Sequence, residues 1–152
     1  MNAPHRPRFS FARGAAALIA LSLFTITGQA PAGEVPVFLG SIGIGKAKPE
    51  VRGELRTLLR AELSSAEFAR VKTNEHYMLS ATLLRLDSVR SSDSVRATCV
   101  VSVAVLRDNG STLYAVIHGR ATAEEAHAGR ARSDALRAAV HSAMVRVPKA
   151  LR

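Results

Sequence analysis

The stretch Val95–Leu106 (VRATCVVSVAVL) decides the fold. Every second residue, starting with Val95, is apolar, whereas the residues between them mix Arg96, Thr98 and Ser102 with apolar side chains. A period of two over twelve residues predicts a β-strand, and the difference between its two faces predicts a sheet that is covered on one side only.

The residues that follow Val95–Leu106 predict a hairpin. Asp108-Asn109-Gly110 is typical of a tight turn, because Asn and Gly tolerate positive φ angles. Thr112–Thr122 then returns as the next strand. We expect one set of its side chains to face the core: Leu113, Ala115, Ile117 and Gly119. The opposite set is expected to face away: Tyr114, Val116, His118 and Arg120.

Two further strands are predicted before Val95. Tyr77–Val89 (YMLSATLLRLDSV) alternates as well, and the turn Ser91-Ser92-Asp93 separates it from Val95. Its core-facing side chains are predicted to be Tyr77, Leu79, Ala81 and Leu83. Val35–Ile44 (VPVFLGSIGI) is apolar and rich in β-branched residues, which indicates a largely buried first strand.

Helical spacing appears in two places. Pro49 suits the first turn of a helix, and the apolar residues after it recur at intervals of three and four: Val51, Leu55, Leu58, Leu59 and Leu63. We expect Glu124–Arg132 to be a polar connection and Ser133-Asp134 to cap a final helix that Pro148 terminates. Its apolar stripe is Leu136, Ala139, Val140, Ala143, Met144 and Val147.

The predicted order is therefore β-α-β-β-β-α, an α/β two-layer sandwich. A right-handed crossover makes the first two strands parallel, and an antiparallel meander adds the rest of a mixed four-stranded sheet. Because each helix has one apolar stripe, both helices are expected to pack on the same face of the sheet.

This layout resembles a fold of bacterial envelope proteins: the TolB N-terminal domain, the curli-secretion lipoprotein and the lipoprotein activators of penicillin-binding proteins. The matching segments are Val37-Phe38-Leu39, Leu55–Phe68, Tyr77–Ala81, Val95–Val105 with Asp108-Asn109-Gly110, and Ala135–Val147. Two features depart from the pattern: the cysteine that carries the lipid in many members is missing, and so is the polar loop after the first strand. The resemblance implies a non-catalytic module that binds a partner in the cell envelope.

The first 32 residues have the pattern of a secretory signal peptide. Arg6, Arg8 and Arg13 precede the apolar run Gly14–Thr27, and Ala30-Pro31-Ala32 supplies small residues for cleavage near Ala32. The run has 14 residues, fewer than the roughly 20 that span a bilayer, so no transmembrane span is expected after cleavage. Retention as an uncleaved anchor is the alternative. We predict a periplasmic or secreted protein with one domain, residues 33–152.

The charge of the chain suggests a second class of partner. Three of the 21 basic residues lie in the leader and all 12 acidic ones lie outside it, so cleavage lowers the net charge from +9 to +6. A basic surface attracts polyanions. The candidate polyanion-binding residues lie along the first predicted helix and around the start of the second: Arg52, Arg56, Arg60, Arg130, Arg132 and Arg137.

No motif in the sequence predicts catalysis or a cofactor. Gly40–Ala47 (GSIGIGKA) approaches a phosphate-binding loop, but Ala47 lacks the hydroxyl that holds magnesium, and export removes the nucleotide. The histidines of the predicted domain have no metal-ligand spacing: His76, His118, His127 and His141. The single cysteine, Cys99, is expected to be a buried core residue. We expect no metal, cofactor or nucleotide.

Three functions remain open. The first is an exported, non-enzymatic module that docks on another envelope protein through a sheet edge or a helix face. The second is a binder of acidic lipid, glycan or nucleic acid through the arginines. The third is an enzyme of unknown class, which would need a deep pocket that holds His118 and a carboxylate.

Overall fold

A computed structural model describes residues 37–45, 47, 49–66, 68, 75–107 and 112–151. The predicted signal peptide, its cleavage near Ala32 and the Asp108–Gly110 turn lie outside these residues. In chain order the elements are β1 (Val37–Gly43), α1 (Pro49–Ser65), β2 (Tyr77–Arg90), β3 (Val95–Arg107), β4 (Thr112–Glu125), α2 (Ala128–Met144) and the short α3 (Val147–Ala150).

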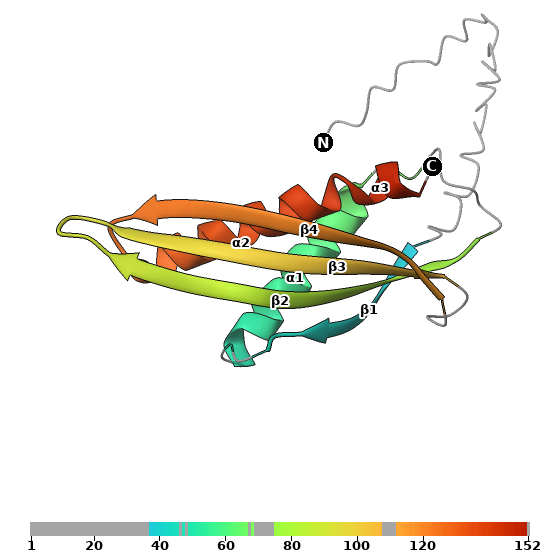
Figure 1. Cartoon of the computed structure of the whole chain (residues 1–152), viewed down its shortest axis with the longest axis horizontal. Helices are drawn as coiled ribbons and strands as arrows, with labels where there is room; N and C mark the ends of the chain where they lie inside the picture. Colours follow the sequence, from blue (N-terminus) through green and yellow to red (C-terminus); the bar gives the residue numbers. More distant parts are fainter. Residues whose placement is uncertain are drawn as a thin grey trace, which may run out of the picture. The chain divides into compact units, whose positions relative to one another are not determined.

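The described strands form one mixed sheet in the order β1-β2-β3-β4 (Figure 1). β1 runs parallel to β2, and both other pairings are antiparallel. The α/β fold, the element order and the four-stranded mixed sheet are therefore as predicted, with α3 as an additional turn of helix after Met144.

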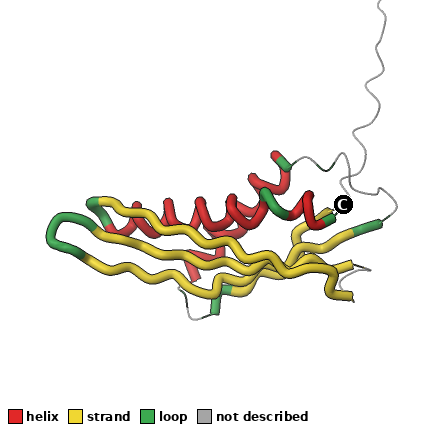
Figure 2. Tube along the Cα trace, turned by 45° about the horizontal axis from the view of Figure 1, so that its top comes forward, coloured by secondary structure: helices red, strands yellow, loops and turns green. Residues whose placement is uncertain are grey.

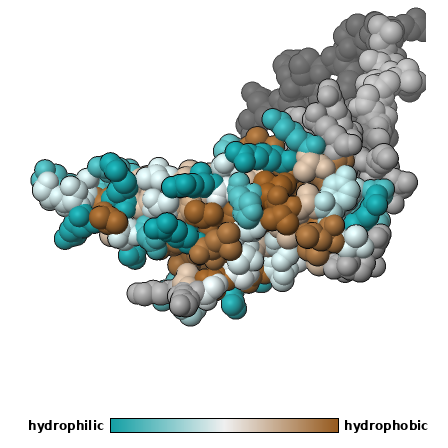
Figure 3. All heavy atoms as spheres, viewed as in Figure 1, coloured by the Kyte–Doolittle hydropathy of each residue, from teal (hydrophilic) through white to brown (hydrophobic). Residues whose placement is uncertain are grey.

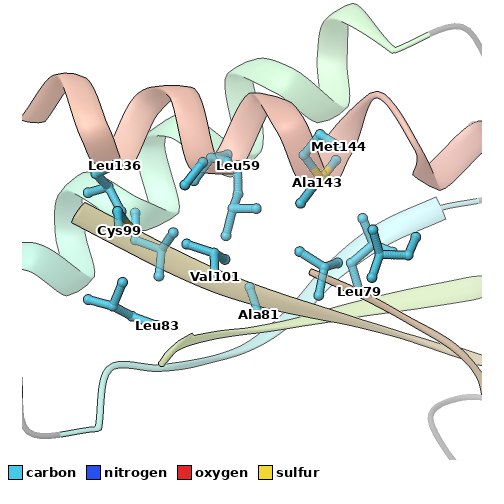
Figure 4. Close-up of a cluster of buried hydrophobic side chains, with 14 of the residues drawn as sticks. Leu59, Leu79, Ala81, Leu83, Cys99, Val101, Leu136, Ala143 and Met144 are labelled. Carbon is cyan, nitrogen blue, oxygen red and sulfur yellow. The ribbon is translucent and has the colours of Figure 1, made fainter. Parts of the chain in front are cut away.

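Both long helices lie on one face of the sheet and leave the other face open (Figure 2). The predicted alternation is confirmed in β3 and in the first half of β2, as far as Leu83. The buried side chains of these strands pack against Leu59 of α1 and against Leu136, Ala143 and Met144 of α2 (Figure 4). Burying each leucine contributes about 2–3 kcal/mol, so this single layer of aliphatic side chains supplies most of the stability.

The two helices run side by side in the same direction. Ser133 Oγ of α2 donates a hydrogen bond to Glu54 of α1 at 2.5 Å, and His141 Nδ1 lies 3.0 Å from a carboxylate oxygen of Glu62. Each contact joins residues 79 positions apart, so one turn of α1 matches one turn of α2 along the whole seam.

The predicted boundary of α2 is wrong. β4 continues to Glu125, and α2 begins at Ala128 with His127 as its N-cap, so Ser133 lies inside the helix and caps nothing. Glu124 bonds with the neighbouring strand and extends β4, whereas buried Ala131 adds an early turn of helix to the core. The expected polar connection is reduced to Ala126 and His127.

The predicted faces of β4 are wrong at its start. Val105 pairs with Ala115 but Leu106 pairs with Leu113, so Tyr114 is an extra residue in a β-bulge. Leu113 consequently shares the open face with Leu106 and is 59% exposed. The Tyr114 ring contacts buried Tyr77 edge-on, with 5.5 Å between ring centroids. From Ala115 onward the predicted alternation holds.

Candidate functional site

The open face of the sheet carries an apolar row across all four strands. Phe38 pairs with Met78, Met78 with Leu106, and Leu106 with Leu113. We call these four residues the apolar row. Phe38 is 43% exposed, and in the next row Ala104 pairs with Val116, which is 48% exposed. Figure 3 looks onto this face and shows apolar atoms gathered towards the end where β1 and β2 begin.

The other half of the open face is charged. Arg85 bonds with Asp87 on β2, and Arg96 of β3 lies 2.9 Å from Glu124 of β4. A hydrogen bond from Ser94 and the contact with Arg96 lower the pKa of the Glu124 carboxyl. Both ion pairs are exposed to solvent, and exposed ion pairs contribute little to the free energy of unfolding. The open face therefore has an apolar half and a half that carries these two ion pairs.

The apolar row was missed by sequence reasoning. Met78 and Leu106 lie at the strand positions that the alternation assigns to the open side, where single apolar residues are common. Only the register of the strands brings them together with Phe38 and Leu113. The available signal in the sequence was that the open-side positions of these strands carry apolar side chains.

The predicted arginines of α1 form an exposed row. Arg52, Arg56 and Arg60 recur once per turn, and no carboxylate of the described residues lies within 4.0 Å of their guanidinium groups. Residues two positions apart differ by about 200° around a helix. Because Glu54 and Glu62 contact α2, the arginine row lies on the flank of α1 that faces away from α2.

The predicted arginines of α2 lie elsewhere. Arg132 reaches the sheet, where its guanidinium donates to Ser88 Oγ at 2.8 and 3.1 Å. Arg137 is four residues from both Ser133 and His141, so it lies on the flank of α2 that faces α1, as does Arg130. The structure therefore places the two sets of arginines on separate surfaces.

Among the described residues, the structure does not bring the candidate catalytic and metal-binding side chains together. His118 is exposed on the open face of β4, and it lines none of the four main cavities formed by the described residues. No group of three or more potential metal ligands occurs in the described part of the chain. Cys99 is fully buried, as predicted, and burial raises the pKa of its thiol to about 12, so it stays protonated and inert.

The glycine-rich segment after β1 does not have the geometry of a phosphate-binding loop. Gly40 and Gly43 belong to β1, and α1 begins at Pro49. Gly45, with φ of 53°, makes the turn between them. The first turn of α1 is therefore displaced from the glycines, as the sequence predicts, and cannot present its N–H groups to a phosphate held there.

A cavity of about 280 Å³ lies where α1 and α2 end, with Met144 and Pro148 among its apolar walls. Its charged groups are the Glu62–His141 pair and Lys149. The pair joins the two helices, so we assign it a structural role.

No helix of the described residues is long and apolar enough to cross a membrane.

Comparison with known proteins places the fold. No protein-family model and no curated protein matches the chain. A DUF330-family protein from Xanthomonas campestris matches with a TM-score of 0.50 and 12% identity, over 74% of this chain and 80% of that one. A candidate lipoprotein from Caulobacter crescentus matches with 0.48 and 16%, over 72% and 86%. PelC from Paraburkholderia phytofirmans, crystallised as a dodecamer, matches with 0.46 and 17%, over 76% and 86%.

At these identities the likeness shows the fold alone. The finer resemblance to the TolB N-terminal domain stays a prediction. The chain has an α/β fold similar to that of the Xanthomonas campestris protein.

Proposed function

We propose that this protein is an exported, non-enzymatic module of the bacterial envelope that binds another protein through the apolar row. The observation that carries the proposal is the row itself, which places Phe38, Met78, Leu106 and Leu113 side by side on the sheet face that the described helices do not cover. Exposed apolar residues that form a contiguous patch are typical of interaction surfaces, whereas scattered ones are not.

The chemistry around the row supports binding of a protein. Aromatic and methionine side chains are enriched in protein interfaces, and Phe38 and Met78 supply one of each to the row. Here the ion pairs Arg85–Asp87 and Arg96–Glu124 lie on the same face beyond the row. The scattered histidines and the inert thiol of Cys99 offer no alternative reaction centre among the described residues.

Photo-crosslinking in intact cells tests this proposal. A benzoyl-phenylalanine residue replaces Phe38 or Leu113, and as a control it replaces exposed Thr57 on α1. The proposal expects both open-face positions to give the same protein adduct, identified by mass spectrometry, and Thr57 to give none. Absence of an adduct at Phe38 and Leu113, or an equal one at Thr57, would contradict it.

A second function is favoured by the unpaired arginines of α1. Arg52, Arg56 and Arg60 are exposed, lack a carboxylate partner among the described residues and lie four residues, about 6 Å along the helix axis, apart. We infer that this row binds acidic lipid or glycan. Replacing all three by glutamine is expected to lower markedly the salt concentration that elutes the protein from heparin.

A matched control separates the row from net charge. The triple variant Arg90→Gln, Arg96→Gln and Arg120→Gln removes the same charge from the sheet. We expect it to elute close to the unmodified protein. Equal shifts for both triple variants, or no retention of the unmodified protein at low salt, would overturn the anion-binding proposal.

A further inference from the structure

β2 is twice as long as the strand that pairs with its outer edge. β1 has 7 residues and β2 has 14, and the pairing between them ends where Gly43 meets Thr82. Beyond Thr82, no described strand pairs with the outer edge of β2. Figure 1 shows β2 continuing past the end of β1 as the free lower edge of the sheet. Among the described residues, the outer backbone N–H and C=O groups of residues 83–90 therefore have no strand partner.

The space beside this edge is hollow. A groove of about 490 Å³ lies between the turn after β1 and β2, lined by Ile44, Gly45, Ala47 and residues 83–87. Leu84 is 55% exposed and Val89 is 70% exposed. β2 has a β-bulge at Leu84, because Leu83 pairs with Val101 and Arg85 with Val100, and the strand is regular again from Arg85 onward. Backbone donors and acceptors along this edge, beside a groove lined by leucines and by the Arg85 and Asp87 side chains, are matched by an extended polypeptide strand.

The sequence of this edge identifies which strand fits. Written antiparallel to itself about Leu86, the segment Leu83–Val89 (LLRLDSV) places Arg85 of one copy opposite Asp87 of the other, twice. Arg85 pairs with Val100 of β3 and Asp87 pairs with Thr98, so both side chains lie on the open face. Directly opposite residues on one face lie within reach of each other, and opposite charges there favour pairing.

The other edge of the sheet is less suited to pairing. The guanidinium of Arg146 donates to the backbone carbonyl of His118 in the middle of β4, at 3.4 Å. A strand added along β4 would have to displace this contact. Along residues 83–90 of β2, no described side chain bonds to the edge backbone.

We propose that two copies of this chain associate through antiparallel pairing of their β2 edges about Leu86, which joins the two sheets into one of eight strands. Each Arg85 then exchanges its Asp87 partner within the chain for Asp87 of the second copy. This interface uses no residue of the apolar row or of the arginine row, so it stands independently of both proposed functions.

Charge reversal tests the register. Sedimentation equilibrium of the exported chain, purified from the cell envelope, measures the dimer dissociation constant. Arg85→Glu places two acidic groups opposite each other, and Asp87→Arg places two basic groups there. We expect each single variant to weaken the dimer by about tenfold or more, because like charges directly opposite repel.

Two rescues follow from the same geometry. A mixture of the Arg85→Glu and Asp87→Arg chains pairs opposite charges in the heterodimer, and the double variant pairs them in the homodimer. Both are expected to regain the original dissociation constant. Circular dichroism checks that each variant is folded, and Arg120→Glu, on the open face of the opposite edge strand, serves as a control that leaves the dimer unchanged.

Three results would overturn the proposal. One is a protein that stays monomeric at all concentrations, which includes the case where the β2 edge binds only a different polypeptide. Another is single variants that dimerise as tightly as the unmodified chain. The third is a dimer that is lost in Phe38→Ser or Leu113→Ser, because those side chains belong to the apolar row and not to this edge.

Discussion

Gly119 is the residue at which α2 comes closest to the sheet. A Cβ atom at this position would lie 1.9 Å from the carbonyl oxygen of Ala139 and 2.9 Å from the backbone nitrogen of Ala143. Because these are backbone atoms of a packed helix, they cannot rotate away. We expect Gly119→Ala to lower the free energy of unfolding by about 3 kcal/mol, measured by urea denaturation.

Gly53 provides the matched control for this substitution. It lies inside α1, and a Cβ atom there would meet nothing within 4 Å. Alanine has the higher helix propensity, so Gly53→Ala is expected to raise the free energy of unfolding by about 1 kcal/mol. Equal effects of the two substitutions would show that α2 does not pack on β4 as closely as described.

The hydroxyl group of Ser133 could stabilise α2 in two ways, as an N-cap or through a hydrogen bond to α1. The sequence predicts an N-cap at this position, whereas the structure gives its hydroxyl a hydrogen bond to Glu54 of α1. We expect a double-mutant cycle with Ser133→Ala and Glu54→Gln to give a coupling energy of about 1 kcal/mol from thermal unfolding. An N-cap would bond its own helix, so additive effects would contradict the interhelical bond.

At the level of elements, the periodicity of apolar residues predicted the regular parts of the strands and helices and missed the irregularities within them. The strand Val95–Arg107 follows its alternation throughout, whereas Tyr77–Arg90 follows it only as far as Leu83, because a bulge at Leu84 shifts its faces by one residue. The bulge at Tyr114 was not predictable, because an inserted residue leaves the composition of a strand unchanged and only shifts its register. The start of α2 was misplaced because Ala128–Arg132 lacks an apolar stripe of its own, although Ala131 is buried by the rest of the fold.

At the level of the molecule, the sequence predicted the layers but not the surfaces they create. Two amphipathic helices and alternating strands require one covered sheet face, and that follows from solvent exclusion alone. The apolar row depends on three strand registers at once. Likewise, the separation of Arg56 from Arg137 depends on which helix flanks meet, and this is set by the contacts of Glu54 and Glu62 with α2.

Two buried acidic groups make the stability of the whole molecule sensitive to alkali. Burial raises the pKa of the Cys99 thiol from 9.0 to about 12. Burial, with the hydrogen bond to Glu75, raises the pKa of the Tyr77 hydroxyl from 10.0 to about 12. The folded state therefore holds protons that the unfolded state has released, so this contribution to stability is complete below pH 9 and is lost as the pH rises towards 12.

Urea denaturation between pH 8 and pH 11 measures this loss. We expect the free energy of unfolding to fall by up to about 1.4 kcal/mol per pH unit above pH 9, and more steeply above pH 10 where both groups contribute. Cys99→Ala lowers the free energy of unfolding at every pH, because it leaves a cavity. It should also remove the fall between pH 9 and pH 10 and keep the fall above pH 10 that is due to Tyr77. A thiol reagent should modify Cys99 only as fast as the protein unfolds. A free energy of unfolding that stays constant to pH 11 would mean that neither group is as buried as the fold requires.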